Sequence, residues 1–434
     1  MENFKKIVKR QTPARTIAVG FAALILSGTV LLLLPVAVQG ARLPGVDALF
    51  TATSAVCVTG LVTVDPGDTF TLFGQVVLAV LMQLGGLGIS SVSMGLAIAA
   101  GRRIGFRGRS LVREALNVES FEGMVKLVRA IMAMTLLVEG IGAVASYPVF
   151  ARDYSPLHAA WISVFHAIAS FNNAGFDVLG GGHSLIPYCN NLWLNLVTDG
   201  MIVLGGIGFM VILDVGRCRG NFRKMSFHTK VVLSTTAVLL FGGMALLQLT
   251  DGLGWMTAFF QSMTARTAGF CTVDFSTLSN AGLLVIMLLM FIGASPGSTG
   301  GGIKTTTFFV LMQQVRSIFS KRRLGAFHRR LPDGSLAKAA TITLMGLIVV
   351  SCGTFALCIL EPETDFLRLL FEQVSAYSTA GLSTGITAGL RAGSKAVLIF
   401  TMFIGRVGAV TLLSLWVERP EPSAHYTEET ITIG

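Results

Sequence analysis

Long apolar runs recur along almost the whole chain, and they limit its fold more than any other feature. Ile17–Val38, Leu72–Ala100, Val231–Leu249 and Ala396–Val417 each reach about the ~20 residues that a helix needs to cross a bilayer. Only 13% of the 434 residues are charged and 53% are hydrophobic, which leaves too few charges to cover a soluble globule of this size. We therefore predict an all-α integral membrane protein surrounded by the lipid bilayer.

The basic residues gather in four clusters between the apolar runs. Residues 5–15, 102–113, 217–230 and 316–330 hold 21 of the 33 Lys and Arg. Because cytoplasmic loops carry an excess of Lys and Arg, this placement predicts a multi-pass protein of the cell (plasma) membrane with a cytoplasmic N-terminus. A nucleic-acid-binding arm is the weaker interpretation of the net charge of +10, and no nucleic-acid partner is expected.

One pattern occurs four times along the chain. Each copy opens with Phe and reaches a Gly ten residues later: "FTATSAVCVTGL" from Phe50, "FHAIASFNNAGF" from Phe165, "FFQSMTARTAGF" from Phe259 and "FEQVSAYSTAGL" from Phe371. A second glycine signature follows each copy, as "LGGLG", "LGGIG", "IGAS" and "IGRVG". The shared spacing predicts a repeated unit of an outer helix, a short helix of about ten residues, a loop and a second spanning helix. We expect the four repeats at 1–118, 119–224, 225–330 and 331–418, followed by a C-terminal tail at 419–434.

The loop of each repeat is predicted to lie at membrane depth. Ten helical residues cover ~15 Å, half of a ~30 Å hydrocarbon core, so the short helix enters the membrane and turns back. Unpaired backbone at that depth is tolerated only where it lines an aqueous cavity or is buried in protein. Such loops can offer their carbonyls to a dehydrated cation. We predict positive φ at Gly60, Gly175, Gly269 and Gly381, where a Cβ is unfavourable; the alternative is that these glycines are C-caps of the short helices.

The second helix of the third repeat is too long to cross the membrane unbroken. Leu278–Val315 would measure ~57 Å as one helix. The stretch "GASPGSTGGGIKTTT" within it predicts two half-helices joined by a polar loop below the ring of carbonyls. Only this helix is expected to be broken. A phosphate-binding loop is disfavoured because Ile303 stands where the Walker pattern requires Lys.

These motifs resemble the superfamily of K+ transporters that includes KtrB, TrkH and the plant HKT proteins, and the length resembles the KtrB type most. The segments "TATSAVCVTGL", "SFNNAGF", "TARTAGF" and "STAGLSTG" match its pore loops. The resemblance implies a single-chain pseudo-tetramer of M1-P-M2 units around a central pore. In some members a Ser in place of the first-loop glycine accompanies Na+ preference, so Gly60 favours K+, with Na+ as the second candidate.

The resemblance also implies the site residues. The selectivity filter, with K+ at its carbonyls, is expected at Val58, Thr59, Gly60, Asn173, Ala174, Gly175, Thr267, Ala268, Gly269, Thr379, Ala380 and Gly381. The gate is expected at Gly293, Ser295, Gly297, Ser298, Thr299, Gly300, Gly301, Gly302, Lys304 and Arg406. The family works as a homodimer with a cytosolic nucleotide-binding regulatory ring of the KtrA type, and no organic cofactor is expected in this chain.

Several other polar residues are predicted to lie near or within the membrane. Asp65, Asp177 and Asp274 form either an acidic outer mouth or three solvated loop acids. Arg266 is expected to point behind the filter and brace Glu372 or a loop carbonyl, since a cation in the ion path would repel K+. The remaining acids, Glu139, Asp199 and Asp214, either relay protons or, as we favour, form hydrogen bonds between helices.

The leading functional hypothesis is a K+ uptake pore driven by the membrane potential. The alternative is a Na+-coupled or H+-coupled secondary transporter, which would show inverted repeats with broken helices in matching halves, whereas these repeats are parallel. An enzyme is not expected, because no nucleophile, base or metal cluster stands out.

Overall fold

Helices make up nearly all of the computed structural model. The structure describes residues 13–40, 42–99, 110–112, 124–320, 324–332 and 334–408. The predicted C-terminal tail, most of the first two basic clusters and the repeat boundary at 118 lie outside these residues.

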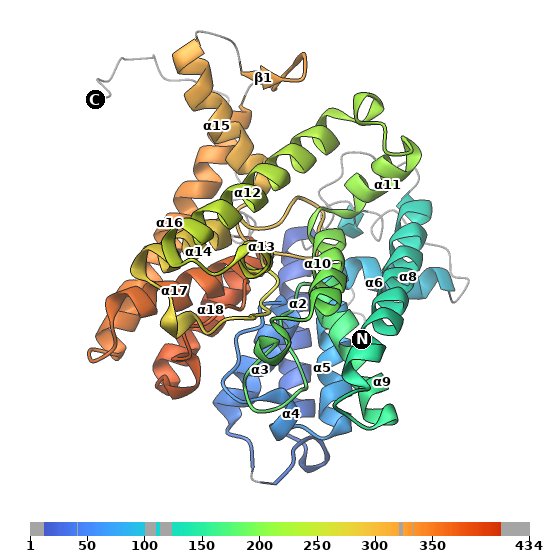
Figure 1. Ribbon diagram of the computed structural model, residues 1–434, viewed down its shortest axis with the longest axis vertical. Coiled ribbons are helices and arrows are strands. Elements are labelled where there is room, and N and C mark those ends of the chain that lie inside the picture. The colour runs from blue at the N-terminus through green and yellow to red at the C-terminus, as the bar shows by residue number, and fades with distance from the viewer. Residues whose placement is uncertain are drawn as a thin grey trace, which may run out of the picture.

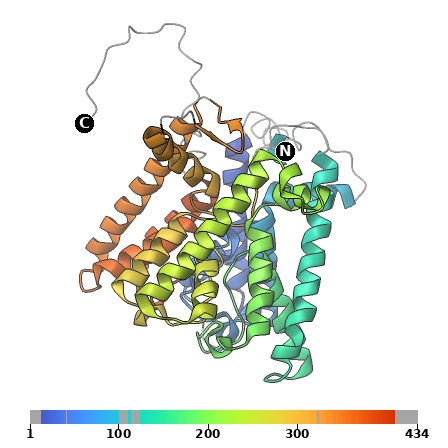
Figure 2. The same cartoon turned by 45° about the horizontal axis from the view of Figure 1, so that its top comes forward.

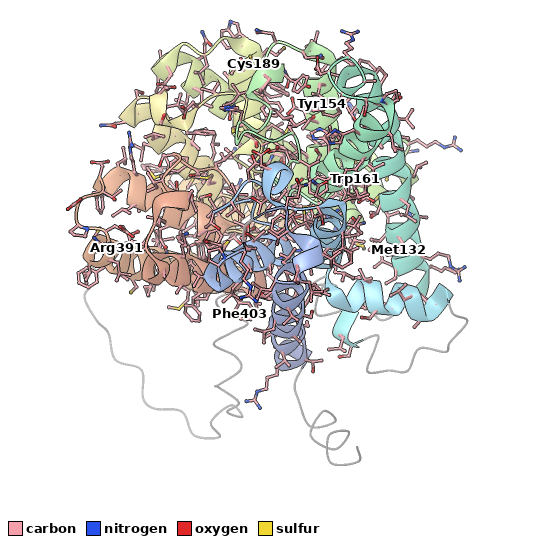
Figure 3. All side chains as sticks on the ribbon, turned by 90° about the horizontal axis from the view of Figure 1, so that it is seen from below. Met132, Tyr154, Trp161, Cys189, Arg391 and Phe403 are labelled. Atoms are coloured by element: carbon pink, nitrogen blue, oxygen red, sulfur yellow. The ribbon has the colours of Figure 1, made fainter. Side chains whose placement is uncertain are left out.

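Four units of the same design follow one another. The outer helices are α2 (Pro13–Leu32), α8 (Met124–Phe150), α12 (Phe227–Asp251) and α16 (Ser335–Leu360). The short helices are α3 (Gly45–Cys57), α9 (Pro156–Phe171), α13 (Trp255–Thr264) and α17 (Phe366–Ser378). The second helices are α5 (Leu72–Leu87), α10 (Leu192–Gly206), α14 (Asn280–Phe291) and α18 (Ala392–Val407). Seen from below in Figure 3, the blue, teal, yellow and orange units succeed one another around a common centre.

Additional elements connect or extend these units. They are α4 (Pro66–Thr69), α6 (Ile89–Ala99), α11 (Phe209–Arg217), α15 (Thr305–Ser320) and a hairpin of β1 (Gly325–Ala326) and β2 (Arg329–Arg330). The 3-10 turns are η1 (Pro35–Ala37), η2 (Ile186–Tyr188), η3 (Phe222–Lys224), η4 (Phe275–Thr277) and η5 (Thr387–Gly389). Figure 1 shows the hairpin and α4 at opposite ends of the molecule. The hairpin carries Arg329 and Arg330 of the fourth basic cluster, so α4 belongs to the side predicted to face outward.

The four outer helices are long and apolar enough to cross a membrane, and the number of such spans rises to six if each of two bent helix pairs counts as one. Three of the four short helices are longer than the ten residues predicted, with 13, 16, 10 and 13 residues. All four short helices begin before the repeated Phe. Pro156 takes the first helical position in α9, and the Asp365 side chain caps α17.

The expectation that only one second helix is broken is wrong. The axes of α5 and α6 meet at 100°, and those of α10 and α11 at 99°. The breaks fall at Gly88 and Gly208, which have φ of +79° and +95°, so each second glycine signature ends a helix. In the third repeat, residues 292–304 separate α14 from α15, as predicted. Figure 2 shows α6 running across the neighbouring α8 rather than along it.

The breaks recur at the same place in consecutive repeats and not in inverted halves. They therefore leave the parallel arrangement of the repeats intact. The repeat boundaries at 224 and 330 fall in the turns before α12 and α16, and the domain division itself stays a prediction.

In three of the four repeats the second glycine signature also lets the second helix touch its own short helix. A Cβ on the signature glycine would collide with a carbonyl oxygen of the last turn of that short helix: Gly85 with Val56, Gly205 with Phe171 and Gly405 with Tyr377. Each of these carbonyls belongs to the residue four positions before the repeated glycine of its loop. Glycine here permits a close approach of two backbones, and this contact fixes the position of the loops.

We predict that Gly205→Ala lowers the stability of the protein in detergent. The added Cβ would meet the Phe171 carbonyl oxygen, and such overpacking costs about 1–3 kcal/mol. Gly200 lies on the same helix with nothing within 4 Å of its Cβ position, so Gly200→Ala is a matched control that should stabilise by ~0.4–1 kcal/mol. Thermal unfolding of both variants measures the difference; equal midpoints would contradict this packing role.

Candidate functional site: the four loops and the loop beneath them

The four loops share an unusual backbone conformation. The repeated glycines have positive φ, at +94° for Gly60, +65° for Gly175, +85° for Gly269 and +82° for Gly381, as predicted. The residue two positions earlier is also positive: Val58 at +58°, Asn173 at +57°, Thr267 at +72° and Thr379 at +51°. The residue between them is not. Positive φ is strongly disfavoured for a β-branched residue, and such strain of about 1–3 kcal/mol gathers at functional sites.

The alternative that the glycines cap the short helices is wrong. The C-cap residues are Val58, Asn172, Ala265 and Thr379, and the glycines follow them by two to four positions. The N–H just before each glycine still donates back to its short helix, as from Thr59 to the Ser54 carbonyl at 2.8 Å and from Ala380 to the Ser375 carbonyl at 2.9 Å.

The four glycines meet around one point. A Cβ on Gly60 would lie 2.6 Å from the Ala174 carbonyl oxygen, and one on Gly175 would lie 2.9 Å from that of Ala268. On Gly269 it would lie 3.0 Å from the Ala380 carbonyl oxygen. A Cβ on Gly381 would collide with the Thr59 carbonyl oxygen, which closes the ring. Each loop thus presents the carbonyl before its glycine to the glycine of the preceding loop, and the first loop presents its own to the fourth.

The surroundings of this ring favour a cation. The C-terminal ends of four short helices, which carry partial negative charge, lead into the loops. Within the described part of the chain, the buried hydroxyls of Thr59, Thr267 and Thr379 and the amide of Asn173 have no hydrogen-bond partner. Oxygen atoms of this kind are the ligands that a partly dehydrated alkali cation takes.

Hydrogen bonds from behind hold the loops in different ways. Ser54 Oγ accepts from the Gly60 N–H at 3.0 Å, and Thr264 Oγ1 donates to the Phe270 carbonyl at 2.6 Å. Glu372 is fully buried and accepts hydrogen bonds from the hydroxyls of Ser383 at 2.7 Å and Thr387 at 2.7 Å, and from the Thr384 N–H at 2.9 Å.

The predicted partner of Arg266 is wrong. Its side chain is buried, and Nη2 donates to Thr236 Oγ1 on α12 at 3.3 Å. Glu372 is already surrounded by hydroxyls of the fourth loop, and Thr236 belongs to the outer helix of the third repeat. The guanidinium points away from the loop and toward α12, the outer helix of the same repeat.

The glycine-rich segment of the third repeat lies directly beneath two of the loops. A Cβ on Gly300 would collide with the Thr267 hydroxyl, and one on Gly301 with the Thr379 hydroxyl. The segment is tied to the break in α10: the Ser295 N–H donates to the Gly206 carbonyl at 3.0 Å, and the Phe209 N–H donates to the Gly297 carbonyl at 3.0 Å.

Additional contacts hold the rest of this segment. Thr299 donates to the Gly205 carbonyl through its N–H and its hydroxyl, both at 3.2 Å, and Ser298 Oγ donates to the Ser295 carbonyl at 2.6 Å. Gly293 packs against the Gly301 carbonyl, and Gly302 has φ of +69°. The predicted gate residues of the third repeat therefore lie together in one structure below the ring.

Two cationic side chains bind this segment. Lys304 Nζ donates to the Gly300 carbonyl at 2.6 Å. Arg406 donates to the carbonyls of Thr299 and Gly85, and to that of Gly86 at 3.1 Å. The Gly85 and Gly86 carbonyls lie in the last turn of α5, where carbonyls lack the usual partner four residues on; the Gly85 carbonyl also accepts from the Gly88 N–H at 3.3 Å. The role of Arg406 in gating stays a prediction.

The three predicted mouth acids make separate contacts, and their role as an outer mouth stays a prediction. Asp65 caps α4 and accepts from the Gly182 N–H of the second repeat, and Asp274 caps η4. Asp177 is half-buried in the loop beyond the second glycine, outside any spanning helix. Burial raises the pKa of Asp177 to about 7; a hydrogen bond from the Leu179 N–H opposes this rise, and the carboxylates of Asp65 and Asp68 add to it.

Two of the three acids assigned to the spanning helices are engaged in hydrogen bonds between elements. Glu139 accepts from Asn172 Nδ2 at 3.1 Å, and Asp214 accepts from Thr229 Oγ1 at 2.6 Å and from the Ser226 N–H at 2.9 Å. Asp199 is buried, and its Oδ1 has no partner among the described residues. The contacts of Glu139 and Asp214 are those of acids that hold helices together.

Comparison with known proteins agrees with this architecture. The sequence profile of the family described as TrkH, cation transport protein, matches residues 4–245 and 225–426. The chain is 38% identical over 449 residues to the potassium/sodium uptake protein NtpJ of Enterococcus hirae, with 99% of each chain covered. It is 36% identical over 446 residues to the Ktr system potassium uptake protein B of Bacillus subtilis, again with 99% of each covered.

The fold has a solved counterpart. The crystal structure of the potassium transporter TrkH from Vibrio parahaemolyticus matches with a TM-score of 0.73 at 19% identity, covering 94% of this chain and 86% of the other. At that identity the match concerns the fold alone. A family of transport proteins agrees with the expectation that the chain is not an enzyme. With a profile that spans nearly its whole length and relatives above 30% identity at full length, the chain belongs to the TrkH family of cation transport proteins.

Proposed function

We propose that this protein is a K+ uptake pore whose selectivity filter is the ring of four loops. The observation that carries the proposal is the repeated backbone, with positive φ two residues before and at each of four glycines that touch one another in ring order. This conformation requires strain at Val58 and Thr267, and strained backbone of this kind serves function. The names of relatives that take up potassium support K+ as the transported ion.

Na+ is the second candidate ion. One relative is named a potassium/sodium uptake protein, and each loop here has one glycine where the K+-channel sequence TVGYG has two. A Na+-coupled or H+-coupled transporter remains the alternative mechanism. Flux into proteoliposomes under an imposed potential, with Na+ present or absent and with a pH gradient present or absent, separates a pore from a coupled transporter.

We propose that the glycine-rich segment 293–302, Lys304 and Arg406 form the gate. The segment lies below the third and fourth loops, and two cations attach to its carbonyls. A guanidinium under the filter repels K+ strongly because the local dielectric is low. Opening therefore requires the segment and Arg406 to leave the ion path together.

The assembly is proposed to be a homodimer controlled by a cytosolic nucleotide-binding ring. Two relatives are named as components of Ktr systems. The described cytoplasmic-side elements are the short α11, η3 and the β1–β2 hairpin, which are too small to bind a nucleotide by themselves. Attachment of a separate regulatory protein at this face supplies such control.

Serine in place of the second or fourth glycine is predicted to weaken K+ selectivity. Gly175→Ser and Gly381→Ser each add a Cβ at a positive φ and against a neighbouring loop, which rotates a carbonyl away from the ion. We expect K+/Na+ selectivity to fall about tenfold, equivalent to ~1.4 kcal/mol. Gly389→Ser is the control, because that glycine is exposed in the same connection and has nothing within 4 Å. Unchanged K+/Na+ selectivity in both filter variants would contradict the filter assignment.

Removal of the gate contacts is predicted to raise K+ flux. Arg406→Ala and a deletion within Gly297–Gly302 should each increase flux by about fivefold or more, and the combination should add little, because both remove one barrier. Arg391→Ala is the control, since it removes a largely exposed cation at the other end of α18. Wild-type flux in folded, correctly inserted Arg406→Ala or deletion protein would place the gate elsewhere.

The external pH is predicted to change the apparent affinity for K+ through Asp177. Since the pKa of Asp177 is raised to about 7, its carboxyl is neutral below that pH and attracts cations above it. As the external pH rises through 7, KM for K+ should fall by about threefold, the effect of one unit charge at roughly 7 Å in water. Asp177→Asn should keep the low-pH KM at all pH values, whereas Asp274→Asn should retain the pH dependence. A pH dependence that survives in Asp177→Asn contradicts this role.

A further inference from the structure

A ring made from one chain has one junction that the chain does not bridge. Successive repeats are joined through the backbone, but the fourth repeat and the first lie at opposite ends of the sequence. In Figure 3 the orange fourth unit lies beside the blue first unit, and α18 packs against α3. Noncovalent contacts alone therefore hold this junction closed.

Hydrogen bonds join the backbone-linked repeats, among other contacts; one of them runs from the Gly182 N–H to the Asp65 carboxylate, and none of the described contacts between these repeats is an ion pair of Lys or Arg. Trp161 Nε1 donates to Gln75 Oε1 at 2.7 Å between the second and first repeats, and the Leu185 N–H donates to the Cys271 carbonyl at 3.0 Å between the second and third. Such bonds are adequate where the chain already keeps the partners near each other.

The unlinked junction contains a buried ion pair instead. Lys395 Nζ lies 2.7 Å from Asp47 Oδ1, and the two side chains are only 11% and 13% exposed. Asp47 is in the first turn of α3, and Lys395 is in the first turn of α18. Solvent and salt weaken a buried pair far less than a surface pair. Removing one partner would leave a buried charge without compensation.

A second basic residue of α18, Arg406, also binds the first repeat. Arg406 lies eleven residues after Lys395, which is ~16 Å along the helix and within about 20° of the same face, because eleven residues make slightly more than three full turns. It binds the carbonyls of Gly85 and Gly86 in α5 of the first repeat. The face of α18 that packs against the first repeat therefore makes a polar contact near each of its ends.

The ion pair is connected to the proposed filter through α3. Asp47 and Cys57 begin and end a rigid stretch of α3, and Thr59 follows two residues later. The Thr59 carbonyl oxygen is the atom that Gly381 of the fourth loop touches. A shift of α3 against α18 moves this contact and with it the distance across the ring.

We infer that Lys395 is a positioning residue that, together with Asp47, closes the ring between the fourth and first repeats and sets the first filter loop against the fourth. The inference rests on the proposed filter.

The test measures K+/Na+ selectivity and K+ flux in proteoliposomes, together with thermal unfolding in detergent. Lys395→Met and Asp47→Asn should each lower selectivity by about threefold or more, and the double variant should be no worse than either single variant, because both lose one interaction. Exchange of the charges, Lys395→Asp with Asp47→Lys, should restore most of the selectivity. The recovery should be incomplete, because Lys and Asp differ in length and the exchanged pair cannot keep the same geometry.

The matched control is Arg391→Met. Arg391 pairs with Glu361 at 3.8 Å within the fourth repeat and is 66% exposed, so its loss should leave selectivity unchanged. If the Met and Asn variants do not fold, Lys395→Arg and Asp47→Glu keep the charges and change the length; they should fold and show a smaller loss of selectivity.

The outcomes separate this inference from the proposed function. Lower thermal stability with wild-type selectivity in the Lys395 and Asp47 variants would overturn the positioning role, as would charge exchange without recovery, while a loss in Gly381→Ser would leave the filter assignment standing. If Gly381→Ser also retains wild-type selectivity, the filter assignment itself is wrong.

Discussion

Backbone carbonyls at membrane depth are the constraint on which the rest of this structure depends. In hydrocarbon, each polar backbone group needs a partner inside the protein. Four loops and three broken helices expose carbonyls in the middle of the molecule, so the chain must provide donors or cations for them. Arg406 and Lys304 donate to the carbonyls around the glycine-rich segment, while the carbonyls of the ring are those that the proposed function assigns to a transported cation. In that proposal, the same chemical need accounts for both sets of carbonyl contacts.

Glycine makes these exposed carbonyls possible in two separate ways. In the loops it permits positive φ, and in the second helices it permits one backbone to lie against another. Gly205 has the second role, since its missing side chain leaves room for the Phe171 carbonyl. In the first, second and fourth repeats the two glycine signatures therefore act together: the second lies against the end of the short helix, and the first turns the loop that follows it.

The repeat spacing was sufficient to predict the loops, because φ preference and spacing are local properties. The four glycines at positive φ and the break after Phe291 follow from them. Positive φ at Val58 and Thr267 could not be predicted, since their side chains disfavour it and only packing around the ring imposes it. The partner of Arg266 depended on the rotation of α13 against α12, which spacing leaves undetermined. The capping role of Asp65 had a signal that was overlooked: Asp followed by Pro is a helix start.

The four loops share a backbone conformation but not their side chains. The residue just before each non-glycine residue with positive φ differs from repeat to repeat. It is Cys57, Asn172, Arg266 or Ser378 in the successive repeats. Asn172 reaches the outer helix of its own repeat through Glu139, and Arg266 reaches its own through Thr236, whereas Cys57 and Ser378 are too short to do the same. The backbone of the ring is therefore nearly fourfold symmetric, whereas the side-chain contacts that hold it are not. These hydrogen bonds tie the second and third loops to their own outer helices. The first and fourth loops flank the junction that no backbone segment links. That junction is held instead by the Lys395–Asp47 ion pair and by Arg406, because no peptide segment joins its two repeats.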